Sequence, residues 1–345
     1  MGVEPLASLA VKYRPKTLDE VCEQPIVVKI LKSICEEDNL GCRNFLLIGP
    51  AGTGKTTIAR AMARELNGCT SNVIEVDAAS NNGVDSMRKI VDQMTSYPVG
   101  TKYKIFIIDE VHVLSSAAWQ VLLKPLENSP GMSVVFLCTT NPEKIPETII
   151  SRVQTFQLSK ISLNGIVARL KFVLDKEIES GRSITYDSQA VNYIAKLAQG
   201  GMRDALTLLD KALAYSSDIN MENITLSLNL PNYDDYFSLL NAYAKRDNKA
   251  IAEMIDSVYN SGVNFLTWFT GFHAFVINIV KYIFMQDIES TMIPSHYQDK
   301  ISCYTVKHSS VCLKLANKLL SMNAELKTTK YLQEVALTYL CSIPK

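Results

Sequence analysis

Hydrophobic residues in the first part of the chain fall into short runs, separated by longer segments with helical periodicity. Four such runs, each of four or five residues, end at turn, acidic or polar positions: 45–48, 73–76, 105–108 and 134–138. Short apolar runs that alternate with helical segments are typical of a parallel sheet with helices on both faces. Ligands of such sheets bind at the carboxyl ends of the strands, so the polar residues after each run are the first candidates for chemistry.

Beyond residue 160 the strand signal fades and helical periodicity takes its place. Three helices are predicted over 166–179, 188–199 and 203–215, with breaks at Gly181 and at Gly200-Gly201. Helical patterns then continue over 234–245, 248–260, 264–285, 309–322 and 327–341. We therefore predict three domains: an α/β domain with a parallel sheet over 1–160, a small helical domain over 161–228 and an all-helical domain over 229–345.

Composition narrows the class of protein. The chain has 345 residues, and its 35 basic residues balance its 35 acidic ones, so it is not a free-standing polyanion binder of the histone type. Its eight cysteines include no C-x-x-C pair, which argues against a structural zinc site and for free thiols in a reducing cytoplasm. The first residues lack the basic-then-apolar order of a secretory signal, and we expect a soluble cytoplasmic protein.

The most apolar long stretch, residues 265–284, carries His273, Asn278 and Lys281. Polar and charged groups are costly inside a bilayer, so this stretch is a poor membrane span. We expect a mostly buried helix instead, and no membrane partner.

The first predicted strand leads into a phosphate-binding pattern. Residues 49–56 fit G-x-x-x-x-G-K-[ST] at every position, and a predicted helix over 57–66 follows. In this pattern glycines let backbone N–H groups wrap the phosphates, Lys55 reaches the β- and γ-phosphates, and Thr56 binds Mg²⁺. A chance match would rarely have both the strand before it and the helix after it. The ATP-binding residues predicted in this segment are Gly49, Pro50, Ala51, Gly52, Thr53, Gly54, Lys55, Thr56 and Thr57.

The third predicted strand ends in two carboxylates, Asp109 and Glu110. We expect Asp109 to hold Mg²⁺, directly or through water, and Glu110 to polarise the attacking water as general base. Acidic pairs are common after strands. This pair, however, follows Lys55 by 54 residues with one further strand between, and the combination predicts a P-loop ATPase.

Three further positions could complete such a site, and each also has a plainer interpretation. Thr140 could contact the γ-phosphate or the water, or could belong to a turn before Pro142. Arg152 follows a short predicted helix that begins at Pro146; it is poorly placed for its own P-loop. It could reach a neighbouring subunit's nucleotide as an arginine finger, or could be a surface arginine. Arg203 could sense the γ-phosphate from a lid, or could simply begin a helix.

These elements, in this order, resemble those of the AAA+ clamp-loader ATPases, and in particular the bacterial DNA polymerase III gamma/tau family. The resemblance covers residues 6–215 and thins to helical pattern alone in the last third of the chain. It rests on K-Y-R-P at 12–15, E-V-D-A-A-S-N-N-G-V at 75–84, D-E-V-H at 109–112, S-R-V at 151–153 and G-M-R-D-A-L at 201–206.

The resemblance implies an AAA+ P-loop domain, a helical lid and a helical collar that joins subunits, usually five, into a ring. Tyr13 and Arg14 would help to bind adenine, Thr140 would be the first sensor, Arg152 the trans-acting finger and Arg203 the second sensor. The implied activity is to open a ring-shaped sliding clamp and load it onto primed DNA. ATP binding would shape the ring, and hydrolysis would release clamp and duplex.

DNA contact is implied through the phosphate backbone, which needs no sequence code. The positions that would face the central channel, or that would be only a solvated helix start, are Asn81, Asn82, Arg88 and Lys89.

Four features depart from the family pattern. The interval 67–72 is too short for the four-cysteine zinc module, so we predict ATP and Mg²⁺ as cofactors and no zinc. Val153 stands where the family has cysteine, a packing change that should leave Arg152 usable. Pro125 should kink or end a helix, because it lacks an N–H and crowds the carbonyl of Val121. The sequence ends without the family's long C-terminal extension, so we expect a minimal loader core.

The hypothesis favoured by the sequence is an ATP-hydrolysing motor subunit of a clamp loader. A non-catalytic scaffold of the same fold is one alternative, but it would not need to keep Lys55, Thr56, Asp109 and Glu110 all intact. Another AAA+ DNA motor, such as a branch-migration helicase, is a second alternative. The stretches 77–84 and 109–112 favour the loader over the helicase.

Overall fold

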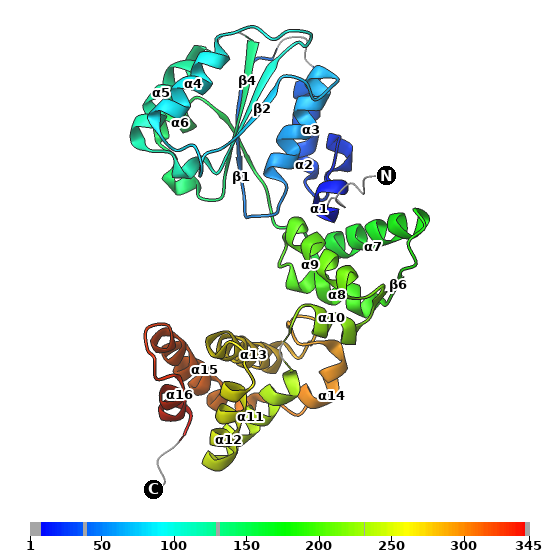
Figure 1. The fold of residues 1–345 in the computed structure, drawn as a ribbon, viewed down its shortest axis with the longest axis vertical. Helices are drawn as coiled ribbons and strands as arrows, with labels where there is room; N and C mark the ends of the chain where they lie inside the picture. The colour runs from blue at the N-terminus through cyan, green and yellow to red at the C-terminus, as the bar shows by residue number, and fades with distance from the viewer. Residues whose placement is uncertain (1–7, 37–39, 129–131, 231, 342–345) are drawn as a thin grey trace. The chain divides into compact units, whose positions relative to one another are not determined.

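The computed structural model describes residues 8–36, 40–128, 132–230 and 232–341. The chain divides into two compact units, Met1–Ile219 and Asn220–Lys345. The first contains the sheet and the small helical region, and the second is helical throughout its described residues (Figure 1). The division into three domains remains a prediction.

A parallel sheet organises the first unit. Among the described residues its strands are β1 (Asn44–Ile48), β2 (Val73–Asp77), β3 (Lys104–Asp109), β4 (Ser133–Thr139) and β5 (Gln154–Gln157). Their order across the sheet is β2-β3-β4-β1-β5, and every neighbouring pair is parallel. The predicted parallel sheet is confirmed, and its strands all end at one edge.

Helices cover both faces of this sheet, as predicted (Figure 1). They are α2 (Pro25–Cys35) and α3 (Lys55–Asn67) on one face, and α4 (Val84–Met94), α5 (Ser116–Asn128) and α6 (Glu147–Ile150) on the other. Successive strand residues point to opposite faces. Phe45 and Leu47 accordingly join the core beneath α2 and α3, while Leu46 joins the core beneath α4 and α5. A strand buried on both sides reads as a continuous apolar run, which is why β1 was predictable.

A helical lid completes the first unit. It consists of α7 (Leu163–Glu179), α8 (Ser188–Leu197), α9 (Met202–Tyr215) and the paired short strands β6 (Thr185–Tyr186) and β7 (Asp218–Ile219). The Ser162 side chain caps α7 by accepting a hydrogen bond from the Gly165 N–H at 3.0 Å. Near the beginning of the chain, α1 (Leu9–Lys12) packs on α9, and the Leu9 N–H donates to Asp210 Oδ2 at 2.8 Å.

The second unit has one aromatic-rich core. Its helices are α10 (Met221–Ser227), α11 (Tyr233–Lys245), α12 (Asn248–Asn260), α13 (Phe265–Met285), α14 (Gln298–Ile301), α15 (Val306–Leu326) and α16 (Leu332–Leu340). Tyr236 of α11 and Trp268 of α13 meet edge to face with ring centroids 4.8 Å apart. Phe272 and Phe275 extend this cluster along α13.

Among the described residues, α13 is long and apolar enough to cross a membrane by length and composition alone. It packs one face against the core and leaves Ile277 and Phe284 exposed. In the most apolar 18-residue stretch of α13, 44% of the residues are buried. The helix is thus less buried than the sequence predicted.

Several elements differ from the sequence prediction, among them β5, α5, α15 and α16. β5 was missed because its four residues include three polar ones, with only Phe156 buried. α5 runs through Pro125 to Asn128, so of the two effects expected of this proline an end of the helix is wrong, while a kink stays a prediction; the Pro125 side chain is buried. α15 extends to Leu326 and α16 begins only at Leu332, five residues later than predicted.

The packing of β1 predicts a large, local loss of stability on truncation of Phe45, which stacks on Phe136 with ring centroids 5.1 Å apart. Phe45→Ala should destabilise the first unit by about 3–5 kcal/mol, because the cavity left behind cannot fully close. Trp119 in α5 and Trp268 in α13 report on the two units separately. In a Trp268→Phe background, the urea midpoint followed by Trp119 fluorescence should fall.

In the reciprocal Trp119→Phe background, Phe45→Ala should leave the Trp268 transition unshifted. Val99→Ala, at a position 87% exposed, serves as the matched control and should move neither transition. Equal shifts in both transitions would contradict the division into two independent cores.

Candidate nucleotide-binding site

A cavity of about 340 Å³ lies at the carboxyl edge of the sheet, between the sheet and the lid of the first unit. Segments that are far apart in the sequence meet there, among them the beginning of the chain, the loop after β1, the end of β3 and the start of α9. The predicted site residues that line it are Tyr13, Arg14, Ala51, Gly52, Thr53, Gly54, Lys55, Thr56, Thr57, Asp109, Glu110 and Arg203.

The loop after β1 depends on glycine at two positions. Gly52 and Gly54 have φ values of +73° and +102°, in the left-handed region that other residues rarely adopt. A Cβ on Gly52 would also lie 3.0 Å from the Cα of Gly201 in the lid. α3 then begins at Lys55, two residues earlier than predicted, so the unpaired N–H groups of its first turn lie at the cavity. Such a helix start favours anions.

Lys55 is nearly buried, and its Nζ donates to the carbonyls of Gly49 at 2.8 Å and Pro50 at 3.0 Å. Thr53 Oγ1 donates to the same Pro50 carbonyl at 2.8 Å, which closes the loop on itself. Gly49 and Pro50 thus shape the loop through their carbonyls, although they are not among the residues lining the cavity. Since both partners of Lys55 are neutral carbonyls, they leave the ammonium charge uncompensated.

The end of β3 is joined to the loop by one hydrogen bond. Thr56 Oγ1 donates to Asp109 Oδ2 at 2.7 Å, and Asp109 Oδ1 accepts from the Glu110 N–H at 2.9 Å. A hydroxyl beside a carboxylate is a hard-oxygen pair of the kind that Mg²⁺ uses, with water and substrate phosphates as its other ligands. The two residues therefore fit the predicted magnesium site.

No group of three or more His, Cys, Asp or Glu side chains that could hold a metal occurs among the described residues. A Mg²⁺ ion held by one or two side chains plus phosphate would not need such a group. The expected absence of zinc stays a prediction.

Glu110 has a strained backbone and a crowded carboxylate. Its φ of +49° lies in the left-handed region, which is uncommon for this residue type and recurs at functional sites. Its Oε2 lies 3.2 Å from Thr140 Oγ1 and 3.3 Å from His112 Nδ1. Thr139 Oγ1 is 3.2 Å from the same histidine nitrogen. Thr140 is thus brought to the candidate base, although it does not itself line the cavity.

The lid supplies the opposite wall. The Met202 N–H donates to the carbonyl of Gly52 at 3.0 Å, so α9 touches the phosphate loop directly, and Arg203 follows on the cavity side. Burial, and then the charges of Arg60 and Arg203, lower the pKa of Arg14 from its usual value. An arginine remains charged under any such shift. The cavity therefore has cationic groups facing the carboxylates of β3, a charge distribution suited to a metal-bound polyphosphate.

Arg152 lies at the other edge of the sheet. Arg152 lies two residues before the first residue of β5, Gln154. Gln154 in turn pairs with Phe45, near the start of β1. The phosphate loop follows the far end of β1, about 13 Å along the strand. The Arg152 guanidinium donates to Glu127, with Nε to Oε1 at 3.0 Å, and Nη1 donates to the Thr148 carbonyl at 2.6 Å. Arg152 is therefore distant from its own phosphate loop, and its action on another subunit stays a prediction.

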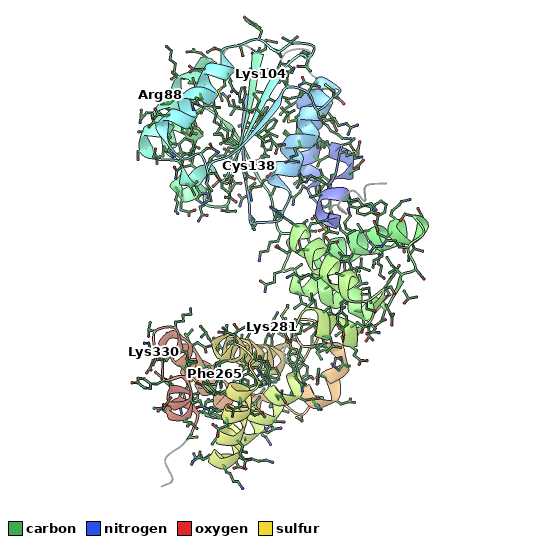
Figure 2. All side chains as sticks on the ribbon, in the orientation of Figure 1. Arg88, Lys104, Cys138, Phe265, Lys281 and Lys330 are labelled. Carbon is green, nitrogen blue, oxygen red and sulfur yellow. The ribbon has the colours of Figure 1, made fainter. Side chains whose placement is uncertain are left out.

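The candidate DNA-facing residues lie on the loop after β2 and on α4, outside the cavity lining. Arg88 is exposed on α4 (Figure 2). It forms an ion pair with Asp85, with Nη1 to Oδ1 at 3.2 Å. Asn81 Nδ2 donates to the Asp77 carbonyl at 3.0 Å. Asn82 and Lys89 are exposed. Their contact with DNA stays a prediction.

Several residues of the site were not singled out from the sequence. Cys22 and Arg169 line the cavity, and Glu127 holds the candidate finger, but no motif covers them. His112 is the last residue of the D-E-V-H pattern, and the sequence assigns it no role of its own. Glu177 had a readable signal, because it continues the apolar face of α7 at helical spacing, where a carboxylate is out of place.

Comparison with known proteins agrees with this geometry. Residues 70–162 match the family model "DNA polymerase III, delta subunit", and residues 165–218 match "DNA polymerase III clamp loader subunit, ATPase lid domain". Among solved structures, the Thermotoga maritima RuvB Holliday junction branch migration motor aligns with a TM-score of 0.52 and 22% identity. The alignment covers 67% of this chain and 78% of that one. At that identity the likeness shows the AAA+ fold and no more.

Curated relatives are more similar in sequence. The chain is 39% identical to Bacillus subtilis DNA polymerase III subunit tau over 60% of its own length and 39% of the relative's. It is 31% identical to the gamma/tau subunit of Mycoplasma genitalium over 82% of its length and 51% of the relative's. With the gamma subunit of Buchnera aphidicola subsp. Schizaphis graminum it shares 36% identity over 74% of its length and 75% of the relative's. The chain thus spans about half or less of the first two relatives and three quarters of the third, and it belongs to the DNA polymerase III gamma/tau family.

Proposed function

We propose that this chain is the ATP-hydrolysing motor subunit of a clamp loader, which opens a sliding clamp and loads it onto primed DNA. The observation that carries the proposal is the separation of the catalytic groups. Lys55, Asp109, Glu110 and Arg203 surround one cavity, whereas Arg152 lies at the opposite edge of the sheet. A site of this kind needs the arginine of a neighbouring subunit, and membership of the gamma/tau family supports the loader among AAA+ motors.

In this proposal the cavity binds ATP from its base to its γ-phosphate. Tyr13 and Arg14 contact the adenine end, and the backbone N–H groups of the 49–56 loop wrap the phosphates, with Lys55 on the β- and γ-phosphates. Thr56 and Asp109 hold Mg²⁺. When bound, Mg²⁺ supplies positive charge that offsets the charge of the phosphate oxygens.

Hydrolysis then needs a general base, neighbouring groups that hold its carboxylate in place, and positive charge near the γ-phosphate. Glu110 takes the proton of the attacking water as that oxygen bonds to the γ-phosphorus and the bond to the bridging oxygen breaks, giving ADP and phosphate. Thr140 and His112, both within 3.3 Å of Glu110 Oε2, hold this carboxylate in place. Arg203 senses the γ-phosphate from the lid, and Arg152 of the neighbouring subunit stabilises the charge of the transition state.

The assembly we propose is a ring of five subunits joined through residues 229–345. Its central channel would hold primed double-stranded DNA by the phosphate backbone, with contributions from Asn81, Asn82, Arg88 and Lys89. The complex would act in the cytoplasm, with ATP and Mg²⁺ as its cofactors and without zinc.

The function is tested by measuring ATP turnover of the assembled complex with and without sliding clamp and primed DNA. Turnover that rises when both are added is the expected result, since hydrolysis serves to release them. A complete lack of turnover would instead support the non-catalytic scaffold. Strand exchange on four-way junctions, without response to the clamp, would support a branch-migration motor.

The phosphate loop has its own test. Lys55→Ala should abolish ATP binding at concentrations that saturate the natural chain, because the loop loses its one buried ammonium charge. Isothermal titration calorimetry measures this directly. Lys124→Ala removes an exposed lysine from α5 and should leave binding unchanged. Retained ATP affinity in the Lys55 variant would refute the assignment of the loop.

A further inference from the structure

The residues that we propose to contact adenine are attached to the lid by hydrogen bonds. Tyr13 and Arg14 line this end, and they directly follow α1, which packs on α9. The Leu9 N–H donates to Asp210 of α9 at 2.8 Å. Arg169 of α7 donates from Nη2 to the carbonyl of Tyr13 at 2.8 Å. Each of these hydrogen bonds links the beginning of the chain to a lid helix.

Glu177 is the centre of this attachment. Its side chain is 2% exposed, and it lies at the end of the apolar face of α7. Its Oε1 accepts from Lys12 Nζ at 2.5 Å and from the Tyr13 hydroxyl at 2.6 Å, and its Oε2 accepts from Arg182 Nη1 at 2.9 Å. Three donors thus converge on one buried carboxylate, two of them cationic.

The charge state of the cluster follows from these contacts. Burial by itself would raise the pKa of the Glu177 carboxyl, but hydrogen bonds from Lys12, Tyr13 and Arg182 lower it to about 2. Burial, followed by the hydrogen bond to Glu177, raises the pKa of the Tyr13 phenol to about 12. At neutral pH the carboxylate is therefore ionised and the phenol is protonated, so the phenol donates to the carboxylate.

A buried ion cluster fixes the positions of its side chains more reliably than it raises the free energy of unfolding. An apolar side chain at position 177 would fill the same face of α7 at less desolvation cost. The carboxylate, by contrast, accepts hydrogen bonds in defined directions, and a satisfied buried network favours one arrangement of its members. Tyr13 is the member that lines the cavity. It is held at its carbonyl by Arg169 and at its hydroxyl by Glu177, which fixes both ends of the residue.

We infer that Glu177 is a positioning residue for the purine end of the nucleotide site, holding Tyr13 against the lid so that base binding and lid orientation depend on each other. The inference rests on the proposed function, in which Tyr13 contacts adenine. Glu177 has no hydrogen bond to the 49–56 loop, so its influence should be confined to the base and should spare the phosphates.

The test compares two ligands on the full chain by calorimetry, both with Mg²⁺: ATP, and inorganic tripolyphosphate, which lacks the base. Glu177→Gln should weaken ATP binding roughly tenfold, because the neutral amide no longer holds the cationic partners and the phenol in one arrangement. Tripolyphosphate binding should not change. Glu179→Gln, an exposed position on the same helix, is the matched control and should change neither affinity.

A second variant keeps the test decisive if Glu177→Gln folds poorly. Tyr13→Phe keeps the ring and removes only the hydroxyl, and it should weaken ATP selectively as well. If Glu177 acts through that hydroxyl, the double variant should bind ATP with about the affinity of whichever single variant binds it more weakly. The effects of two substitutions on binding do not add when the residues act as a unit.

The outcomes separate this inference from the function on which it rests. If the natural chain does not bind ATP, the proposed function fails and the inference fails with it. If the natural chain prefers ATP over tripolyphosphate, but the variants lose both ligands equally or lose neither, Glu177 has only a structural role and the inference is overturned while the function stands.

Discussion

The common edge at which the parallel strands end is the constraint on which the rest of this site depends. β1 pairs with β4, and β4 with β3, so the phosphate loop, Thr140 and Asp109 leave neighbouring strands at the same side of the sheet. The hydrogen bond from Thr56 to Asp109, at 2.7 Å, then joins the loop to β3. Side-chain direction alternates along a strand, so a shift of β3 by one residue would turn Asp109 to the other face and break this contact. The same topology sends Arg152, which precedes β5, to the opposite edge.

The cavity has two walls with different attachments. In the proposed function, the phosphate end of the cavity is formed by the loop and β3 of the sheet, whereas the base end is attached to the lid through Tyr13, Arg169 and Glu177. The contact between Met202 and Gly52 is where the two walls meet. A nucleotide that spans them would favour one orientation of the lid over others, and to the same extent that orientation would favour the nucleotide. In the proposed ring, this reciprocity would let a binding event change the shape of the assembly.

The sequence predicted those elements whose structure depends on residues close together in the chain. β1, β3 and β4 are apolar runs buried on both faces, β2 is a half-buried edge strand, and the phosphate loop has a spacing that its backbone chemistry demands. What it missed depends on tertiary packing. β5 is polar except for Phe156 and becomes a strand only because β1 offers an edge. α5 continues past Pro125, and Leu126, which directly follows this proline, packs in the core between α5 and the sheet. Glu127 resembles any other acidic helix residue until the fold brings Arg152 to it. Glu177 differs only in its place on the apolar face of α7, and its partner Tyr13 comes to it through the fold.

A site shared between subunits is tested most directly by complementation in the assembled complex. Arg152→Ala removes the finger that a subunit gives to its neighbour, and Glu110→Gln removes the base of its own site, so complexes built from either variant alone should turn over ATP very slowly. When the two variants are mixed before assembly, some sites combine an intact Glu110 with an intact neighbouring Arg152. Turnover should then rise well above that of either variant. If the turnover of the mixture is only the average of the two single-variant complexes, each chain uses its own arginine or none. That result would contradict a shared site.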